Sequence, residues 1–217
     1  NRTGFFHKVR EILESEPEQD FAIAYFNIKR FKTVNDLFGY ESGDELLKRV
    51  AEILAGCFLN PLAVGRMEAD RFVALTKKED MDLERLPELL HRTYTKGELN
   101  LDLYGKCGVY FIPRHTRLSV TEMCDRAKIA KSYISNQFVQ PYSVFNEQMR
   151  VDYEQRSIAL FHLDDAIRNG EIQVYYQPIY DAWTGEIALA EALARWFSGE
   201  FGSISPAKFI PTLEESG

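Results

Sequence analysis

Residues 62–75, LAVGRMEADRFVAL, place two short apolar segments on either side of a charged tip. Apolar segments of this length joined by a short polar stretch predict a β-hairpin, because both arms can be buried while the turn stays in water. The tip must then hold four charged side chains at one end of a sheet: Arg66, Glu68, Asp70 and Arg71. Such a tip is either an ordinary solvated turn or part of a site, and the rest of the chain decides between them.

The pattern around this hairpin alternates helices with strands. An aromatic and β-branched run at 21–28 predicts a buried strand. Ser42 and Glu45 have the spacing of a capping box, which predicts a helix that begins there and ends at Gly56. Other periodic segments predict helices at 5–12, 83–90 and 120–134 and strands at 106–112 and 142–145. This order predicts an α/β sandwich of helices packed on a mixed sheet.

The pattern changes after Asn146. Residues 147–169 contain neither Pro nor Gly and predict one long helix. Residues 172–180 and 187–196 flank a turn sequence and predict a second hairpin, and Ser205 with Pro206 predicts the start of a final helix. We therefore expect three segments: a domain at 1–146, a connecting helix at 147–170 and the beginning of another domain at 171–217.

Composition and charge exclude several classes of function. A net charge of -7 argues against a nucleic-acid partner, although a local pocket can still take a small anion. Three cysteines without a CxxC pair predict neither a disulfide framework nor a zinc site, and the histidines lack ligand spacing. No apolar run approaches the ~20 residues of a membrane helix. A cytoplasmic location is expected, with any membrane tether placed upstream in a longer parent protein.

Residues 26–47, FNIKRFKTVNDLFGYESGDELL, resemble the opening motif of GGDEF domains, the diguanylate cyclase family. This match aligns the first hairpin with the signature turn of the family. Five residues then stand where Gly-Gly-Asp-Glu-Phe is expected: Glu68, Ala69, Asp70, Arg71 and Phe72. The resemblance implies a palm-like sandwich with a mainly antiparallel sheet flanked by helices.

The resemblance also implies phosphoryl transfer from GTP with two divalent cations held by carboxylates. At the acidic positions of the first strand this sequence has Asn27 and Lys29. Asp70 retains one carboxylate and is a weak candidate metal ligand, whereas Arg71 replaces a second acid. Glu68 and Ala69 add side chains where glycine lets backbone approach a phosphate. We therefore expect no catalysis from this domain.

Other positions of the nucleotide site persist. By resemblance, Asn35 and Asp44 bind guanine and Lys32 contacts phosphate. The alternative is structural: Asn35 caps a turn, and Asp44 lies in the first turn of its helix, where the helix dipole favours an acid. Lys128 and Lys131 could face phosphate, but a solvated helix face is favoured for both. The family's inhibitory product-binding motif is absent, because its Arg and Asp positions are Leu59 and Leu62.

Residues 173–217 resemble the start of an EAL domain, the cyclic di-GMP phosphodiesterase family, through YQPI, EALARW and SPAKFIP. The resemblance assigns Glu191 to a catalytic metal and Gln177 and Arg195 to the dinucleotide. Magnesium or manganese is expected for the complete EAL domain, and no cofactor is expected to bind this chain firmly. A TIM-like barrel takes about 250 residues, so only its first hairpin and helix are present.

This incomplete segment should leave apolar side chains uncovered. They would pack on the first domain, pair with another copy or remain poorly ordered. The residues concerned are Tyr175, Ile179, Leu193, Trp196 and Phe209.

The leading hypothesis is a catalytically inactive GGDEF domain that senses GTP and regulates an attached EAL phosphodiesterase. One alternative is residual diguanylate cyclase activity. Another is an interaction module that binds no nucleotide and forms a homodimer through the helix at 147–169. The expected partners are GTP or cyclic di-GMP and the rest of the EAL domain.

Overall fold

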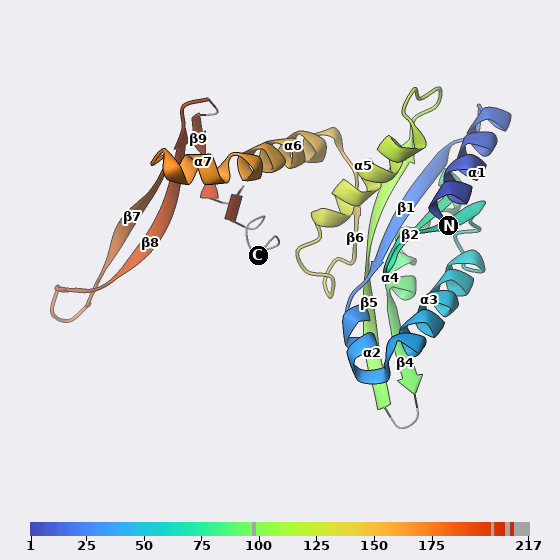
Figure 1. Ribbon diagram of the computed structural model, residues 1–217, viewed down its shortest axis with the longest axis horizontal. Coiled ribbons are helices and arrows are strands. Elements are labelled where there is room, and N and C mark those ends of the chain that lie inside the picture. The colour runs from blue at the N-terminus through green and yellow to red at the C-terminus, as the bar shows by residue number, and fades with distance from the viewer. Residues whose placement is uncertain (97–98, 201, 207–208, 211–217) are drawn as a thin grey trace. The chain divides into compact units, whose positions relative to one another are not determined.

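A computed structural model describes residues 1–96, 99–200, 202–206 and 209–210 of the chain (Figure 1). The chain divides into two compact units, Asn1–Met149 and Arg150–Gly217.

A mixed, mainly antiparallel sheet forms the centre of the first unit (Figure 1). Its strands lie in the order β2–β3–β1–β5–β4, and the short β6 pairs with β5 as the parallel member. The strands are β1 (Phe21–Ile28), β2 (Ala63–Glu68), β3 (Arg71–Lys77), β4 (His91–Lys96), β5 (Leu99–Ile112) and β6 (Tyr142–Val144). The predicted first hairpin is β2 and β3, and the predicted sandwich is confirmed.

Helices cover both faces of this sheet (Figure 1). α1 (Arg2–Ser15) and α5 (Val120–Ser132) pack on one face. The other face carries α2 (Phe31–Phe38), α3 (Tyr40–Ala55) and α4 (Leu86–Leu90), and a short 3₁₀ turn, η1 (Lys78–Asp80), follows β3. The central strand β1 is buried on both faces because alternate residues enter different cores: Ala22, Ala24, Phe26 and Ile28 on one side, and Phe21, Ile23 and Tyr25 on the other.

α5 lies directly on β5 at Gly108. A β-carbon at Gly108 would lie 1.8 Å from the Ala127 carbonyl oxygen and 2.6 Å from the Lys131 backbone nitrogen. Gly108 is opposite Tyr25 in the β1–β5 ladder. The close approach therefore places the C-terminal part of α5 beside the end of β1.

The predicted start of α3 is wrong. The helix begins at Tyr40, and its N-cap is Gly39, which makes no side-chain cap hydrogen bond. The Ser42 hydroxyl donates to the Phe38 carbonyl at 2.7 Å rather than capping the helix. The capping box that the structure contains is Ser119 with Glu122, at the start of α5.

Two elements of the first unit were not predicted. α2 has only eight residues, with Val34 buried and Phe31 and Phe38 packed against the same core. β4 is a polar edge strand without apolar alternation, and β5 begins at Leu99, well before the predicted Lys106. Both strands nevertheless contribute to the core, in which Tyr94 of β4 and Leu103 of β5 are buried.

The second unit contains a helical segment and a three-stranded sheet. The predicted single helix is two helices, α6 (Glu147–Phe161) and α7 (Leu163–Arg168), with an interruption at His162. The predicted hairpin is confirmed as β7 (Ile172–Tyr180) and β8 (Ile187–Ser198), and β9 (Gly202–Ile204) adds an unpredicted strand. Most of the predicted final helix lies outside the described residues.

A small core holds this second unit together. Trp196 and Phe209 are only 1% and 2% exposed and contact each other edge to face, with Ala166 of α7 beside them. The Trp196 indole nitrogen also donates to Glu171 at 3.1 Å. The expectation that these two aromatic residues are uncovered was therefore wrong, because α7 and β9 supply partners for them. Tyr175 and Ile179 remain exposed, as predicted.

Substitution of Gly108 by alanine should destabilise the first unit by about 3 kcal/mol or more, because the new methyl group meets backbone atoms of α5 that cannot move alone. Urea unfolding followed by circular dichroism measures this loss. Gly56→Ala is the matched control, since its β-carbon would lie 3.6 Å from the nearest backbone oxygen. Equal stabilities of the two variants would contradict the close helix contact.

Candidate functional site

The charged tip of the β2–β3 hairpin is held by contacts among its own residues. Arg66 Nε donates to the Ala69 carbonyl oxygen at 2.7 Å. Arg71 forms an ion pair with Glu68, its partner across the hairpin. Both interactions are exposed and therefore contribute little stability, but they set the positions of the side chains around the turn.

Ala69 adopts a left-handed backbone conformation, with φ of 40°. Glycine is favoured in this region because it lacks the Cβ that clashes there. The turn therefore keeps a glycine-type conformation at the position where the GGDEF resemblance expects the second glycine, but with a methyl group added.

Asp70 is tied to the end of β1. Asn27 Nδ2 donates to Asp70 Oδ2 at 2.6 Å, and the backbone nitrogen of Ile28 donates to the Asp70 carbonyl at 3.2 Å. The structure thus brings together the two residues that the resemblance assigns to the metal site. An amide donor therefore engages one oxygen of the Asp70 carboxylate, Oδ2.

Cationic side chains flank Asn27 on both neighbouring strands. In the ladders Asn27 is opposite Arg71 of β3 and Lys106 of β5, so all three side chains point to the same face of the sheet. Lys106 Nζ donates to the Ile134 carbonyl at 2.5 Å, just beyond α5. Sequence analysis missed Lys106, because only the strand register places it beside Asn27.

Lys131 also faces this site, so the predicted solvated position is wrong for it. Its side chain is half-buried, and Nζ lies 5.7 Å from the centre of the Tyr25 ring. Burial first, and then the charges of Arg71, Lys29 and Lys128, together lower the pKa of Lys131 to about 8, while Asp70 opposes them. Lys128 is exposed, as predicted.

The guanine-binding candidates lie at the junction of α2 and α3. Asn35 Oδ1 packs against Gly43, the residue before Asp44. A β-carbon added at Gly43 would lie only 1.9 Å from this oxygen. Asp44 is beyond the first turn of α3, where Glu41 is the acidic residue, so the helix-dipole interpretation of Asp44 fails. Lys32 is exposed on α2. Leu59 is fully buried in the core, consistent with a structural role.

The donor set around Asp70 does not fit a pair of divalent cations. Hard cations need several oxygen ligands, mostly carboxylates. Among the described residues, no three His, Cys, Asp or Glu side chains come together as a metal site. The other carboxylate near Asp70 is that of Glu68, and it forms an ion pair with Arg71.

The EAL candidates share one face of the β7–β8 hairpin. Gln177 is directly opposite Glu191, and Arg195 lies four residues beyond Glu191 on the same strand. Glu191 and Gln177 are exposed, and Arg195 Nη1 donates to the Ala194 carbonyl at 2.9 Å. These three side chains form an open polar row.

The fold agrees with the family comparisons. Residues 1–136 match the model described as diguanylate cyclase, GGDEF domain, and residues 162–217 match the EAL domain. The chain belongs to the GGDEF domain family, and a partial EAL domain follows the GGDEF domain. The predicted GGDEF-like α/β fold is confirmed.

Curated relatives extend this assignment. The chain is 28% identical to cyclic di-GMP phosphodiesterase PdeR of Escherichia coli, over 100% of this chain and 33% of that protein. It is 27% identical to the bifunctional diguanylate cyclase/cyclic di-GMP phosphodiesterase MucR of Pseudomonas aeruginosa, over 92% of this chain and 30% of that protein. The chain thus spans about a third of the length of these relatives.

A solved structure shares the fold. The S helix, GGDEF and EAL segment of LapD from Vibrio cholerae, bound to c-di-GMP, matches with a TM-score of 0.60 and 15% identity. The match covers 100% of this chain and 51% of that one. No helix among the described residues is long and apolar enough to cross a membrane.

Replacement of Lys131 by methionine should stabilise the protein at pH 7 by about 1–2 kcal/mol, because a half-buried ammonium among like charges is removed. In the folded protein the pKa is about 8, against an ordinary value of 10.5, so the unfolded chain holds this proton more tightly. The free energy of unfolding of the wild type should therefore rise between about pH 8 and pH 10.5. The extra stability of Lys131→Met over the wild type should shrink over the same range.

Thermal unfolding of both proteins from pH 7 to pH 10.5 measures this difference. Burial raises the pKa of Tyr25 above its ordinary value, so the change expected from Lys131 is read at the lower end of this range. A difference that stays constant with pH would contradict the buried position of the ammonium.

Proposed function

We propose that the first unit is a catalytically inactive GGDEF domain that binds GTP and regulates the EAL phosphodiesterase of a longer protein. The observation that carries this proposal is the hydrogen bond between Asn27 and Asp70, with Arg71 and Lys106 on either side of Asn27. The single carboxylate beside β1 is already engaged, and the neighbouring side chains are cationic.

Electrostatics disfavour a metal pair at this position. Two like unit charges about 4 Å apart repel by about 4 kcal/mol at an effective dielectric constant of about 20, and the repulsion doubles for a divalent ion. Asn27 and Lys29 offer no carboxylate to offset it. In-line transfer between two GTP molecules needs such metals to neutralise charge, so we infer that this unit does not form cyclic di-GMP.

Binding of a nucleotide remains compatible with this arrangement. Asn35 packs against Gly43, the residue before Asp44, and an amide together with a carboxylate is a donor and acceptor combination that suits the edge of guanine. Both are accessible, and Lys32 lies on the same short helix as Asn35. A domain that retains base recognition without turnover is suited to sensing GTP.

The second unit would supply the start of the phosphodiesterase. We propose the domain limits 1–146, 147–170 and 171–217, with Glu191 as one metal ligand and Gln177 and Arg195 as dinucleotide contacts. Magnesium or manganese would bind once the remaining barrel strands add their carboxylates. Cyclic di-GMP, GTP and the rest of the EAL domain are the proposed partners, and the cytoplasm is the proposed location.

Residual diguanylate cyclase activity is the second candidate, favoured by the carboxylate that Asp70 retains and by the similarity to bifunctional MucR. We expect no cyclic di-GMP when the chain is incubated with GTP and manganese, because the metal ligands are missing. Mass spectrometry with a known amount of added cyclic di-GMP sets the detection limit. Product above that limit would favour the second candidate.

Calorimetric titration with GTP should detect binding, and Asp44→Ala should weaken it about tenfold by removing a charged hydrogen-bond partner. Glu45→Ala is the control, since Glu45 is an exposed acid on the same helix. Absence of GTP binding in the wild-type chain would leave only an interaction module, for example a homodimer, as the role of this unit.

A further inference from the structure

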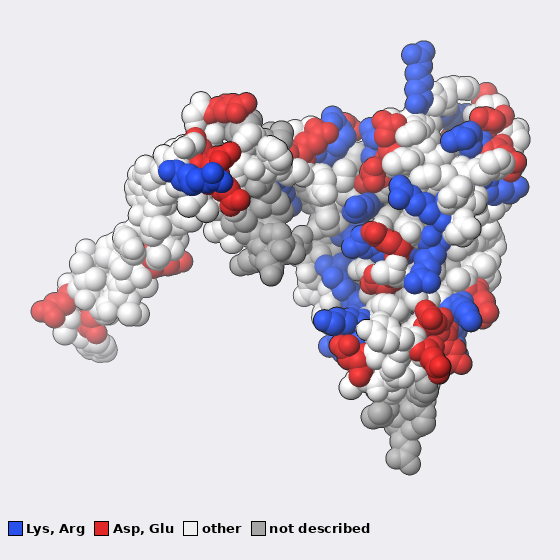
Figure 2. Space-filling view, viewed as in Figure 1, with Lys and Arg blue, Asp and Glu red and all other residues white. Residues whose placement is uncertain are grey.

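Five cationic side chains of the described residues lie beside Asn27 or close to Lys131. They come from β3, β5, α5 and the segment after β1: Lys29, Arg71, Lys106, Lys128 and Lys131. Two carboxylates, those of Asp70 and Glu68, lie in the same region. Figure 2 shows Lys and Arg side chains gathered where α5, β1 and β5 meet in Figure 1. The cluster therefore carries more positive charge than its own carboxylates neutralise.

The backbone holds these charges together. Arg71 and Lys106 stand on either side of Asn27 because of the strand register. Lys131 is brought over Tyr25 because α5 contacts β5 at Gly108. The cluster is thus built by the packing of the sheet and one helix rather than by a flexible loop.

The cost of this arrangement points to an anionic ligand. Lys131 is half-buried, and its ammonium feels the charges of Arg71, Lys29 and Lys128. An anion beside these groups would relieve their mutual repulsion, and phosphate oxygens accept the charge-assisted hydrogen bonds that lysine and arginine donate. Asp70 competes weakly, because Asn27 already donates to it.

We propose that this cluster binds a polyphosphate directly, without a divalent cation, and that magnesium weakens the binding. The cations occupy the region where metal ions would otherwise neutralise a triphosphate. A magnesium-bound triphosphate carries less negative charge and would bring its metal against Arg71, Lys106 and Lys131. This inference rests on the nucleotide site proposed above, and it changes the ligand from a metal–nucleotide complex to the free polyphosphate.

Calorimetric titration of the whole chain with inorganic triphosphate, in EDTA and in excess magnesium, tests the proposal. We expect binding in EDTA and at least about tenfold weaker binding in magnesium. Lys131→Met should weaken binding in EDTA about tenfold by removing a charge-assisted contact. Thermal unfolding of the variant checks that it is folded.

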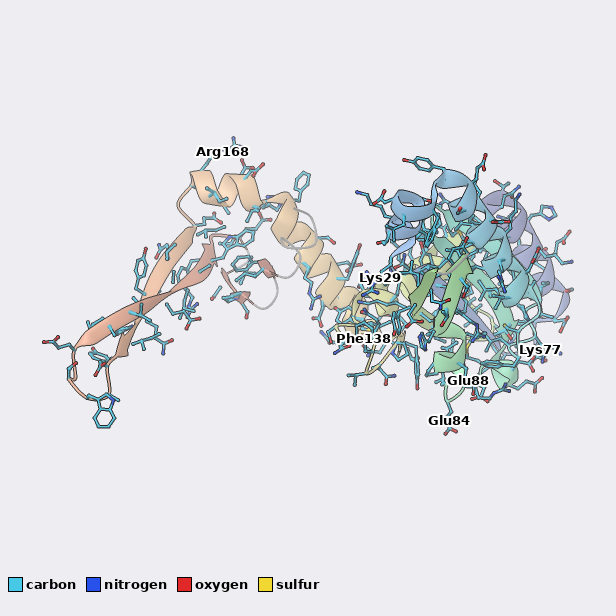
Figure 3. The ribbon with its side chains drawn as sticks, turned by 90° about the horizontal axis from the view of Figure 1, so that it is seen from below. Lys29, Lys77, Glu84, Glu88, Phe138 and Arg168 are labelled. Atoms are coloured by element: carbon cyan, nitrogen blue, oxygen red, sulfur yellow. The ribbon has the colours of Figure 1, made fainter. Side chains whose placement is uncertain are left out.

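Lys77→Met is the matched control and should bind like the wild type. Lys77 lies at the opposite end of the β1–β3 ladder from Arg71, and Figure 3 shows it on the other side of the unit from Lys29. A variant with Asn27→Asp and Lys29→Asp should show the reverse preference, with tighter binding in magnesium, because it restores two carboxylates.

The inference is overturned if triphosphate binds only with magnesium, or if it binds in neither buffer. It is also overturned if Lys131→Met and Lys77→Met weaken triphosphate binding equally. A parallel titration with GTP separates it from the proposed function. GTP that binds only with magnesium would keep the regulatory function and refute the metal-free site. Triphosphate that binds in EDTA as tightly as GTP would keep the metal-free site and refute guanine recognition.

Discussion

The hydrogen bond from Asn27 to Asp70 determines the chemistry available at the charged end of the sheet. It joins the end of β1 to the hairpin turn with a neutral amide where the family resemblance expects an acid. The carboxylate of Asp70 is then satisfied without a metal ion, and the turn closes against the backbone of Ile28. Lys29 and Arg71 place cations where the family resemblance implies acids, which amounts to a charge inversion.

The contact of α5 with Gly108 completes this charge inversion. Without a side chain at Gly108, the helix backbone reaches the sheet and carries Lys131 to the ring of Tyr25. The ammonium loses hydration there and gains like-charged neighbours, which is unfavourable in the absence of a ligand. A group of like charges that destabilises the free protein, and that a bound ligand would stabilise, is typical of a functional site rather than of a part of the fold that serves stability.

Much of the fold could be predicted from the sequence because burial leaves a clear pattern. The apolar run of β1 and the two arms of the first hairpin predicted the centre of the sheet, and the second hairpin was equally clear. The short α2 and the polar β4 were missed, and each places a single residue in the buried core, Val34 and Tyr94. The start of α3 was misplaced because Ser42 and Glu45 have capping spacing, while the backbone turns at Gly39 instead.

The candidate site was predictable only in part. Asn27, Lys29 and Asp70 follow from motif positions, but the place of Lys106 depends on strand register and that of Lys131 on one glycine contact. A charged residue on an amphipathic helix normally faces water, so the pattern of α5 favoured the wrong position for Lys131. Long-range packing, which one sequence does not reveal, decided both residues.

The most direct measurement is an anomalous diffraction map from crystals of the chain grown with GTP and manganese. We expect no manganese peak beside Asn27 and Asp70. Two well-occupied manganese ions about 4 Å apart at Asn27 and Asp70 would contradict the charge inversion on which both proposals rest.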